Sequence, residues 1–220
     1  MKYDAIVLGG GVGKRADLGF NKVLYKMKNG KTVLNNACDI FLNDCDCQRV
    51  IVVCNFDIDF SNDKLIVTSG GKERYESVLN GLKHVTSEYV LIHDGARPFL
   101  DKEDLDNLKD EVVKYDCALL AKKAVDTIKY VDDGFVDKTI DRAHIYYALT
   151  PQGFKSEIIK GAYSSIDLLG ITDDASVCEK CGYKVRIVEC IHDNHKLTLK
   201  DDFKNIWLKK WLLLREKTIL

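Results

Sequence analysis

The arrangement of short apolar runs along the chain limits its fold more than any other feature of the sequence. Four runs rich in β-branched residues lack polar alternation, so each predicts a strand buried on both faces. They occupy residues 5–8, 50–53, 65–67 and 89–92. One amphipathic helical pattern covers 73–85, a second follows the expected N-cap Asp101, and a third runs from residue 202 to Leu214. Strands that alternate with helices predict an α/β fold with a Rossmann-like, mostly parallel sheet covered by helices.

One stretch of the chain, at 124–147, departs from this alternation. It places β-prone residues on either side of Asp133-Gly134, and Asp-Gly between two such segments is a strong signal for a two-residue hairpin turn. A hairpin added to an α/β fold is either a lid or an arm that grips another subunit. Because no repeat or linker divides the chain, we expect one domain over 1–220 with a protruding β-hairpin arm over 124–147.

Composition excludes several classes of protein. With 33 Lys and Arg against 34 Asp and Glu, the net charge is −1, which argues against a dedicated nucleic-acid binder. No apolar stretch approaches the roughly 20 residues that cross a bilayer, and the N-terminus has no pattern of a signal peptide. The eight scattered cysteines suit reduced thiols, so we expect a cytoplasmic protein without membrane association. Cys178 and Cys181 have the spacing of half a zinc site, but a second tight pair is missing, which indicates ordinary thiols.

The first expected strand ends in a glycine-rich, cationic loop. Residues 9–15 are Gly-Gly-Gly-Val-Gly-Lys-Arg, and Lys22 follows seven residues after Arg15. Glycines let backbone N–H groups approach an anion closely. The loop is neither a Walker motif, which needs Ser or Thr after Lys14, nor a dinucleotide motif, which needs glycine in place of Lys14. Its cations favour a triphosphate ligand, although a flexible connection with solvated lysines explains the same residues.

A second polar cluster, at 93–98, directly follows the fourth expected strand. Ligands of parallel sheets bind at the carboxyl ends of the strands, so Asp94 is in place to hold a metal ion. A helix or turn cap is the structural alternative for such an aspartate, but the neighbouring Arg97, held by Pro98, favours a binding site. Further polar segments, each with a local explanation such as a turn or a cap, are 69–77, 141–142, 150–152, 172–176 and 193–198.

Taken in order, these segments resemble the 2-C-methyl-D-erythritol 4-phosphate cytidylyltransferases of the non-mevalonate isoprenoid pathway. The matching motifs are Gly-Gly-x-Gly-x-Arg at 10–15, Gly-Gly-x-x-Arg at 70–74, His-Asp-Gly-Ala-Arg-Pro at 93–98, and shorter ones at 126–129, 141–142, 150–152, 172–176 and 194–198. The resemblance implies an enzyme that transfers CMP from CTP to a polyol phosphate and releases pyrophosphate. It also implies Mg²⁺ or another divalent cation, and a homodimer formed through the hairpin arm. Asn21 stands where the family usually has proline, which predicts a looser connection before Lys22.

The resemblance also implies a role for individual residues, position by position. The triphosphate would be held by Gly10, Gly11, Gly13 and Arg15. The reacting α-phosphate would be flanked by Lys22 and Lys196, and with Arg15 these are the implied catalytic residues. The metal would be bound by Asp94. The cytosine would be met by Gly71 and Ser77, with Gly95 also in the nucleotide site. The polyol phosphate would be received by Thr127, Arg142, Thr172 and Arg97.

Two other functions fit the same fold. A ribitol-5-phosphate cytidylyltransferase shares the loop and the reaction, but Gly95-Ala96 and residues 174–176 favour the erythritol enzyme. A non-catalytic nucleotide-binding protein is the alternative from another class. Against it stands the set of residues around the expected α-phosphate, since a binding module has no need of cations there. That set consists of Arg15, Lys22, Asp94 and Lys196.

Overall fold

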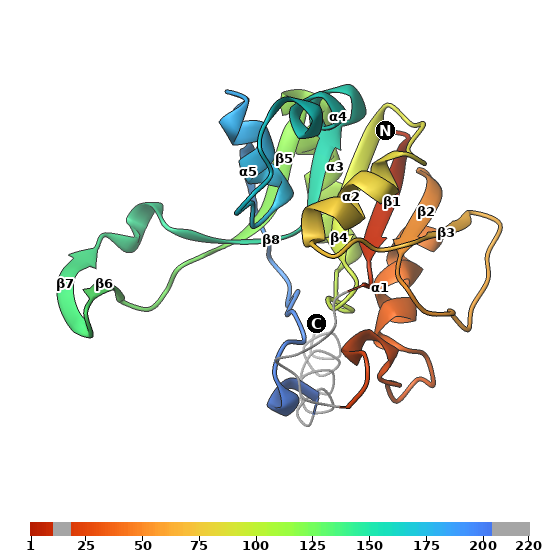
Figure 1. The fold of residues 1–220 in the computed structure, drawn as a ribbon, viewed down its shortest axis with the longest axis horizontal. Helices are drawn as coiled ribbons and strands as arrows, with labels where there is room; N and C mark the ends of the chain where they lie inside the picture. The colour runs from red at the N-terminus through yellow and green to blue at the C-terminus, as the bar shows by residue number, and fades with distance from the viewer. Residues whose placement is uncertain (11–18, 204–220) are drawn as a thin grey trace, which may run out of the picture.

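A seven-stranded sheet forms the centre of the molecule in the computed structural model, which describes residues 1–10 and 19–203 (Figure 1). The order of its strands is β3-β2-β1-β4-β8-β5-β9. The four expected apolar runs lie in β1 (Tyr3–Leu8), β2 (Cys47–Val53), β3 (Leu65–Thr68) and β4 (Tyr89–Asp94). The other strands of the sheet are β5 (Cys117–Lys123), β8 (Tyr146–Lys155) and β9 (Arg186–Glu189). Within this sheet β8 runs antiparallel to β4 and β5, and the other paired strands are parallel, so the predicted, mostly parallel α/β fold is confirmed.

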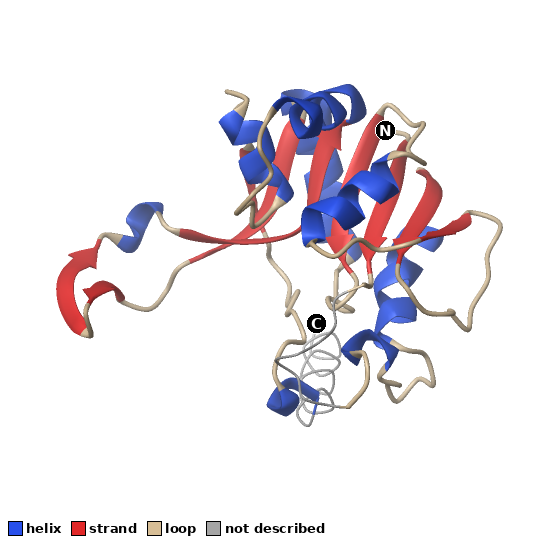
Figure 2. Cartoon of the chain, viewed as in Figure 1, coloured by secondary structure: helices blue, strands red, loops and turns tan. Residues whose placement is uncertain are grey.

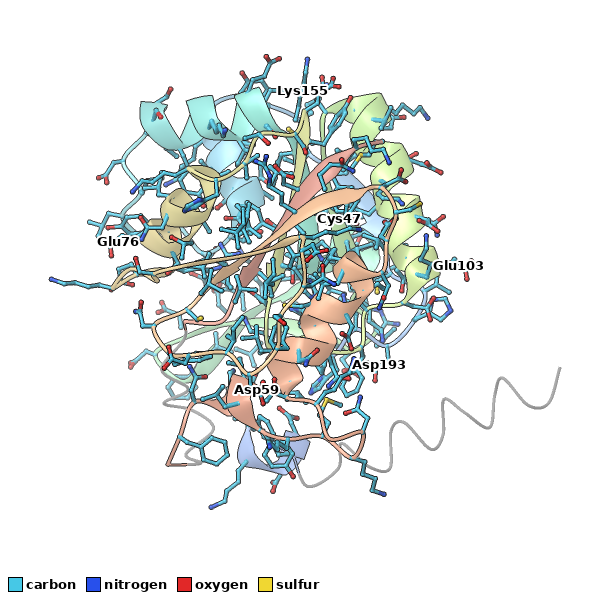
Figure 3. The ribbon with its side chains drawn as sticks, turned by 90° about the vertical axis from the view of Figure 1, so that its right-hand side faces the viewer. Cys47, Asp59, Glu76, Glu103, Lys155 and Asp193 are labelled. Atoms are coloured by element: carbon cyan, nitrogen blue, oxygen red, sulfur yellow. The ribbon has the colours of Figure 1, made fainter. Side chains whose placement is uncertain are left out.

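Helices cover both faces of the sheet (Figure 2). On one face, α1 (Val33–Leu42) packs on β1 and β2, and α3 (Lys102–Tyr115) packs on β5, β8 and β9. On the other face lie α2 (Arg74–Leu82), α4 (Ser156–Ser165) and α5 (Asp174–Lys180). Because β-strand side chains alternate in direction, successive residues of each strand serve the two apolar cores in turn. In Figure 3, Glu76 on α2 and Glu103 on α3 lie on opposite sides of the sheet.

Local capping explains where two of the expected helices begin. The Asp101 carboxylate accepts a hydrogen bond from the backbone N–H of Glu103 over 3.0 Å, which confirms it as the N-cap of α3. At the start of α2, the Glu76 carboxylate accepts from the N–H of Glu73 over 3.1 Å, as in a capping box. The third expected helix extends to Leu214, and its residues from 204 onward lie outside the described part of the chain.

The carboxyl ends of the parallel strands converge at one end of the sheet. There Gly95 donates its N–H to Leu8 O over 2.9 Å, and Gly9 donates to Val53 O over the same distance. Figure 3 shows Lys155, at the end of β8, at the opposite end of the molecule from Asp193. Gly9 and Gly10, Asp94 and residues 192–196 therefore lie at the edge where ligands bind in such sheets.

The stretch 124–147 contains the predicted hairpin. Strands β6 (Ile128–Asp132) and β7 (Phe135–Ile140) pair with each other, and Asp133 and Gly134 at the turn have φ of 44° and 80°. Positive φ at both central residues matches the twist of the flanking strands. The hairpin projects away from the sheet (Figure 1) and exposes apolar side chains, including Phe135 at 77% of its area.

At the opposite end of the sheet from the site, a buried ion cluster ties α3 to the segment before β2. Lys109 Nζ lies 2.9 Å from Asp44 Oδ2 and 3.2 Å from Asp46 Oδ2, and the Tyr3 hydroxyl donates to Asp44 Oδ2 over 2.9 Å. Burial alone would raise the pKa of Asp44, but the Asp46 N–H and the Lys109 ammonium lower it below its usual range. This carboxylate therefore stabilises the fold above pH ~4, and that contribution is lost as the pH falls through its lowered pKa.

Substitution of Lys109 by methionine is expected to lower the free energy of unfolding by about 3–5 kcal/mol at pH 7, because it leaves the Asp44 carboxylate buried without its counter-ion. Urea unfolding followed by circular dichroism measures the change. Lys102→Met is the matched control. Lys102 pairs with Asp106 on the same helix but is 59% exposed, so its loss should cost less than about 1 kcal/mol. Equal effects of the two substitutions would contradict a structural role for the buried cluster.

Candidate active site

The end of β1 lies beside the turn that follows β3. A side-chain carbon placed on Gly10 would lie 3.7 Å from Val53 O and 3.8 Å from Gly70 Cα. The two glycine segments that the sequence assigned to the nucleotide are therefore neighbours. Gly11, Gly13 and Arg15 lie outside the described residues, so their predicted roles stay predictions.

Asn21 holds the start of the short 3-10 helix η1 (Lys22–Leu24). Its Oδ1 accepts from the Val23 N–H over 3.2 Å, and its Nδ2 donates to Gly9 O over 3.2 Å. The φ angle of Asn21 is −65°, which is the angle that a proline ring imposes. Hydrogen bonds thus hold this residue on both sides, and the looser connection predicted from the loss of proline stays a prediction.

The turn at Gly71 is closed by Ser77. The Gly71 N–H donates to Ser77 Oγ over 3.0 Å, and a side-chain carbon on Gly71 would lie only 2.2 Å from Glu76 Cβ. Asn55, which sequence reasoning missed, fixes the same turn, because its side chain accepts from the Gly70 N–H over 2.8 Å and donates to Gly70 O over 3.3 Å. Its position just beyond β2, at the binding edge of the sheet, is the signal that would have found it.

Asp94 at the end of β4 is surrounded by cations. Its Oδ2 lies 2.7 Å from Lys196 Nζ and 3.7 Å from Arg97 Nε, and its Oδ1 lies 3.9 Å from Arg74 Nε. Burial by itself would raise the pKa of Asp94, but the nearby charges of Lys196, Arg74 and Arg97 lower it far below its usual range. The carboxylate is therefore ionised at neutral pH and oriented by its neighbours.

His93 and Thr150 form the buried support of Asp94. The backbone N–H of Asp94 donates to Thr150 Oγ1 over 3.0 Å. His93 Nε2 lies 3.0 Å from Arg97 O, which only accepts, so this nitrogen carries the proton and Nδ1 accepts from the Thr150 hydroxyl at 3.1 Å. Burial lowers the pKa of His93 to about 4. The imidazole is therefore neutral and positions the backbone.

A pocket of about 260 Å³ opens beside Lys196. Two of its buried polar atoms, Arg97 Nε and Asn194 Oδ1, have no hydrogen-bond partner among residues 1–10 and 19–203. Asn194, also missed as an individual residue, donates from Nδ2 to Thr150 O over 2.7 Å. Its backbone carbonyl accepts from Arg97 Nη1, also over 2.7 Å. The lining is formed by Arg97, Lys122, Tyr147, Leu149, His192, Asp193, Asn194, His195 and Lys196. Cations and open hydrogen-bonding groups of this kind suit an anionic ligand that carries hydroxyl groups.

Three predicted substrate residues lie elsewhere in the chain. Thr127 and Arg142 are exposed on the hairpin arm, where Arg142 starts the 3-10 helix η2 (Arg142–His144) and donates to Val125 O. Thr172 is exposed two residues before α5. None of the three lines the pocket. One chain therefore brings together Asp94, Arg97 and Lys196. Thr127 and Arg142 belong to the arm, which projects away from the sheet (Figure 1).

The donor set at Asp94 fits a nucleotide-bound magnesium ion. The described residues contain no group of three histidine, cysteine or acidic side chains that would enclose a metal. Mg²⁺ is usually bound through one or two carboxylates together with substrate phosphates and water. A single ionised carboxylate beside a cationic pocket matches this usual coordination of Mg²⁺. Cys178 is buried in the core and Cys181 caps α5, as expected of ordinary thiols.

The family model described as IspD, 2-C-methyl-D-erythritol 4-phosphate cytidylyltransferase, matches residues 4–207. The chain belongs to this family. A relative of that name from Geobacillus thermodenitrificans is 39% identical, covering 92% of this chain and 94% of the relative. One from Shouchella clausii is 37% identical over 96% and 98% of the two chains. The crystal structure of the Francisella tularensis family member superposes with a TM-score of 0.82 at 29% identity, over 94% of this chain and 98% of that one.

Membership of the family makes this chain a CTP-dependent nucleotidyltransferase, specifically a cytidylyltransferase. The resemblance inferred from eight short motifs is thereby confirmed. The prediction of an enzyme, in preference to a non-catalytic nucleotide-binding protein, is confirmed as well. Within the described part of the chain, no helix has the length and apolar character needed to cross a membrane.

Proposed function

We propose that this enzyme transfers CMP from CTP to 2-C-methyl-D-erythritol 4-phosphate and releases pyrophosphate, as a step in the synthesis of isoprenoid precursors. The observation that carries the proposal is the ionised Asp94 carboxylate, with Lys196 on one oxygen, next to a cationic pocket. The family match and the relatives' names support the same reaction. The residues present supply charge, which is what phosphoryl chemistry requires.

The reaction needs no general base from the protein. The second pKa of a phosphate monoester is about 6, so the attacking phosphate of the acceptor is already mostly ionised at neutral pH. His93, the histidine that contacts the backbone of Arg97, is neutral, and both of its ring nitrogens have partners. It holds the loop in place and takes no part in proton transfer.

What the protein supplies is a cationic environment for two polyanions. Lys196 carries a flexible side chain that is 36% exposed, so its ammonium can move from Asp94 to the α-phosphate of CTP. Lys22, at the start of η1, is proposed to contact the same phosphate from the other side. Arg97 would hold the acceptor phosphate in the pocket. A divalent cation held by Asp94 would neutralise part of the charge on the phosphates of CTP.

We also propose that two copies of the chain assemble through their hairpin arms. The arm exposes Tyr130, Val131, Phe135 and Val136 by more than half of their area each, and an isolated two-stranded hairpin is marginally stable in water. In a two-fold dimer each arm would carry Thr127 and Arg142 to the pocket of the partner. The dimer, the magnesium requirement and the cytoplasmic location stay predictions.

Substrate choice provides the direct test of this function. With 2-C-methyl-D-erythritol 4-phosphate as acceptor, CTP should be used about 10–100-fold more efficiently than UTP, because an unpaired buried polar group at the base costs ~1–3 kcal/mol. ATP should be poorer still, since a site that binds the cytosine edge should reject the larger purine. Pyrophosphate release, measured for each pair of nucleotide and acceptor, gives kcat/KM. Ribitol 5-phosphate in place of the erythritol derivative is the control for the acceptor. Equal turnover of ATP would contradict the nucleotide assignment, and faster turnover of ribitol 5-phosphate the acceptor assignment.

A further inference from the structure

Two polar motifs have no role in the reaction as described so far, one at Arg74 and one at 173–174. The structure joins them behind Asp94. Arg74, the first residue of α2, donates from Nη1 to Asp174 Oδ1 over 2.9 Å and from Nη2 to Asp174 Oδ2 over 2.6 Å. Two parallel bonds of this kind match the fork of a guanidinium to a carboxylate and restrict its orientation more than a single contact does.

Asp174 is the fully buried member of this pair. Its Oδ1 also accepts a hydrogen bond from the Tyr163 hydroxyl over 2.6 Å. Two donors from Arg74 and one from Tyr163 thus satisfy the carboxylate inside the protein. Because removal of the guanidinium would leave a buried charge without its partner, Asp174 holds Arg74 firmly.

Gln152 on β8 anchors Asp174 to the sheet. Its Oε1 accepts from the backbone N–H of Asp174 over 3.0 Å and of Ala175 over 2.8 Å. Gln152 pairs with Ile92 of β4, two residues before Asp94. The start of α5 and the Asp94 carboxylate are therefore attached to adjacent strands, and their relative position is set by the sheet.

The remaining guanidinium nitrogen of Arg74 faces Asp94. Arg74 Nε lies 3.9 Å from Asp94 Oδ1, which is close enough for attraction but too long for a hydrogen bond. Both terminal nitrogens of Arg74 are engaged by Asp174, so only Nε is left for Asp94. Asp94 Oδ2 carries the short contact to Lys196, while Oδ1 accepts no hydrogen bond from the residues at 1–10 and 19–203.

We propose that Asp174 is a positioning residue that holds Arg74 away from Asp94 and so keeps the Asp94 carboxylate free to bind a divalent cation. The inference rests on the proposed metal-binding role of Asp94. Without the charge of Asp174, Arg74 would turn its fork to Asp94, the other carboxylate within its reach, and occupy both oxygens. Gln152 acts through Asp174 by fixing the place of its backbone.

The test measures metal binding in the absence of turnover. Titration calorimetry with CTP but without acceptor, once in EDTA and once in Mn²⁺, yields the ratio of the two dissociation constants, which reports the metal's contribution. Asp174→Asn keeps the size of the side chain and removes its charge. We expect this substitution to weaken the metal's contribution by about tenfold or more, as partners of metal ligands do, while CTP binding in EDTA stays close to that of the wild type.

The double variant Arg74→Gln/Asp174→Asn shows whether Arg74 must be held away from Asp94 or supports Asp94 directly. It lacks the guanidinium that would cover Asp94, so the ratio should return to near the wild-type value. Tyr163→Phe is the matched control, because it removes one donor to Asp174 and leaves the ion pair with Arg74. Its ratio should match that of the wild type. Thermal unfolding shows whether each variant is folded, and the double variant, with no unpaired buried charge, serves even if the single variant unfolds.

Two results would overturn the positioning role of Asp174. One is an unchanged ratio in folded Asp174→Asn protein. The other is a double variant as weak as the single one, which would mean that Arg74 supports Asp94 directly. A wild-type enzyme whose CTP affinity gains nothing from Mn²⁺ would be a different failure. It would remove the metal role of Asp94, and the positioning role with it, while leaving cytidylyl transfer itself in place.

Discussion

Alanine in place of Lys196 is expected to lower kcat by about 10³-fold, while the dissociation constant of CTP changes much less. The reason is that charge on the α-phosphate develops in the transition state, and a preorganised donor there contributes on the order of 10²–10³ in rate. An interaction made in the transition state alone lowers kcat and kcat/KM together. Single-turnover kinetics and calorimetric titration of CTP separate the two quantities.

Lys196 has a second contact that shapes this expectation, because its ammonium lies 2.7 Å from Asp94 Oδ2. Its removal frees that oxygen, so metal-dependent CTP binding should be retained or strengthened. Lys200→Ala is the control, since Lys200 is an exposed lysine four residues further along the chain. A Lys196→Ala enzyme with normal kcat and a raised KM would show that this lysine binds ground-state phosphate instead.

Recovery of activity from two inactive variants is the second large effect that we expect. Lys196→Ala and Arg142→Ala subunits, unfolded together and refolded, should regain about a quarter of wild-type activity if each active site combines one chain's pocket with its partner's arm. Random pairing makes half of the dimers mixed, and two-fold symmetry leaves one of the two sites in each mixed dimer intact. Pyrophosphate release from CTP measures the recovery.

The control for this experiment pairs two lesions on the arm. Thr127→Ala mixed with Arg142→Ala should recover nothing, because every site then receives one damaged arm. If Arg142 serves its own subunit, the first mixture also stays inactive, since each site keeps one lesion. Inactivity in dimers shown by a size-tagged subunit to be mixed would therefore exclude a site shared between chains.

Local patterns were sufficient for the elements that depend on neighbours in the sequence. The apolar runs at 5–8 and 89–92 became central strands because their side chains suit burial on both faces of a sheet. Asp133-Gly134 forms the turn of the hairpin because these residues tolerate positive φ, and Asp101 caps α3 with its own side chain. Each of these preferences involves only a few consecutive residues.

The site was predicted more unevenly. The eight motifs, taken as a family resemblance, placed Asp94, Arg97 and Lys196 in one site, and the structure brings these three together. The same motifs did not reveal that Asn21 replaces proline by hydrogen bonds. The arm residues Thr127 and Arg142 lie away from the pocket because the arm projects from the sheet. The direction of the arm cannot be read from the sequence pattern of one chain.

The sequence by itself determined the class of fold, the hairpin and the set of residue types needed for phosphate chemistry. Only the tertiary structure decided which of those residues meet. Antiparallel β8 lies between β4 and β5, and this order brings Gln152 next to the strand that ends in Asp94. Arg74 reaches Asp174 across 100 positions of the chain, and Lys196 reaches Asp94 across 102. Contacts of that range depend on strand order and on the packing of two helical layers, because local backbone preferences carry no information about which distant carboxylate a cation will find.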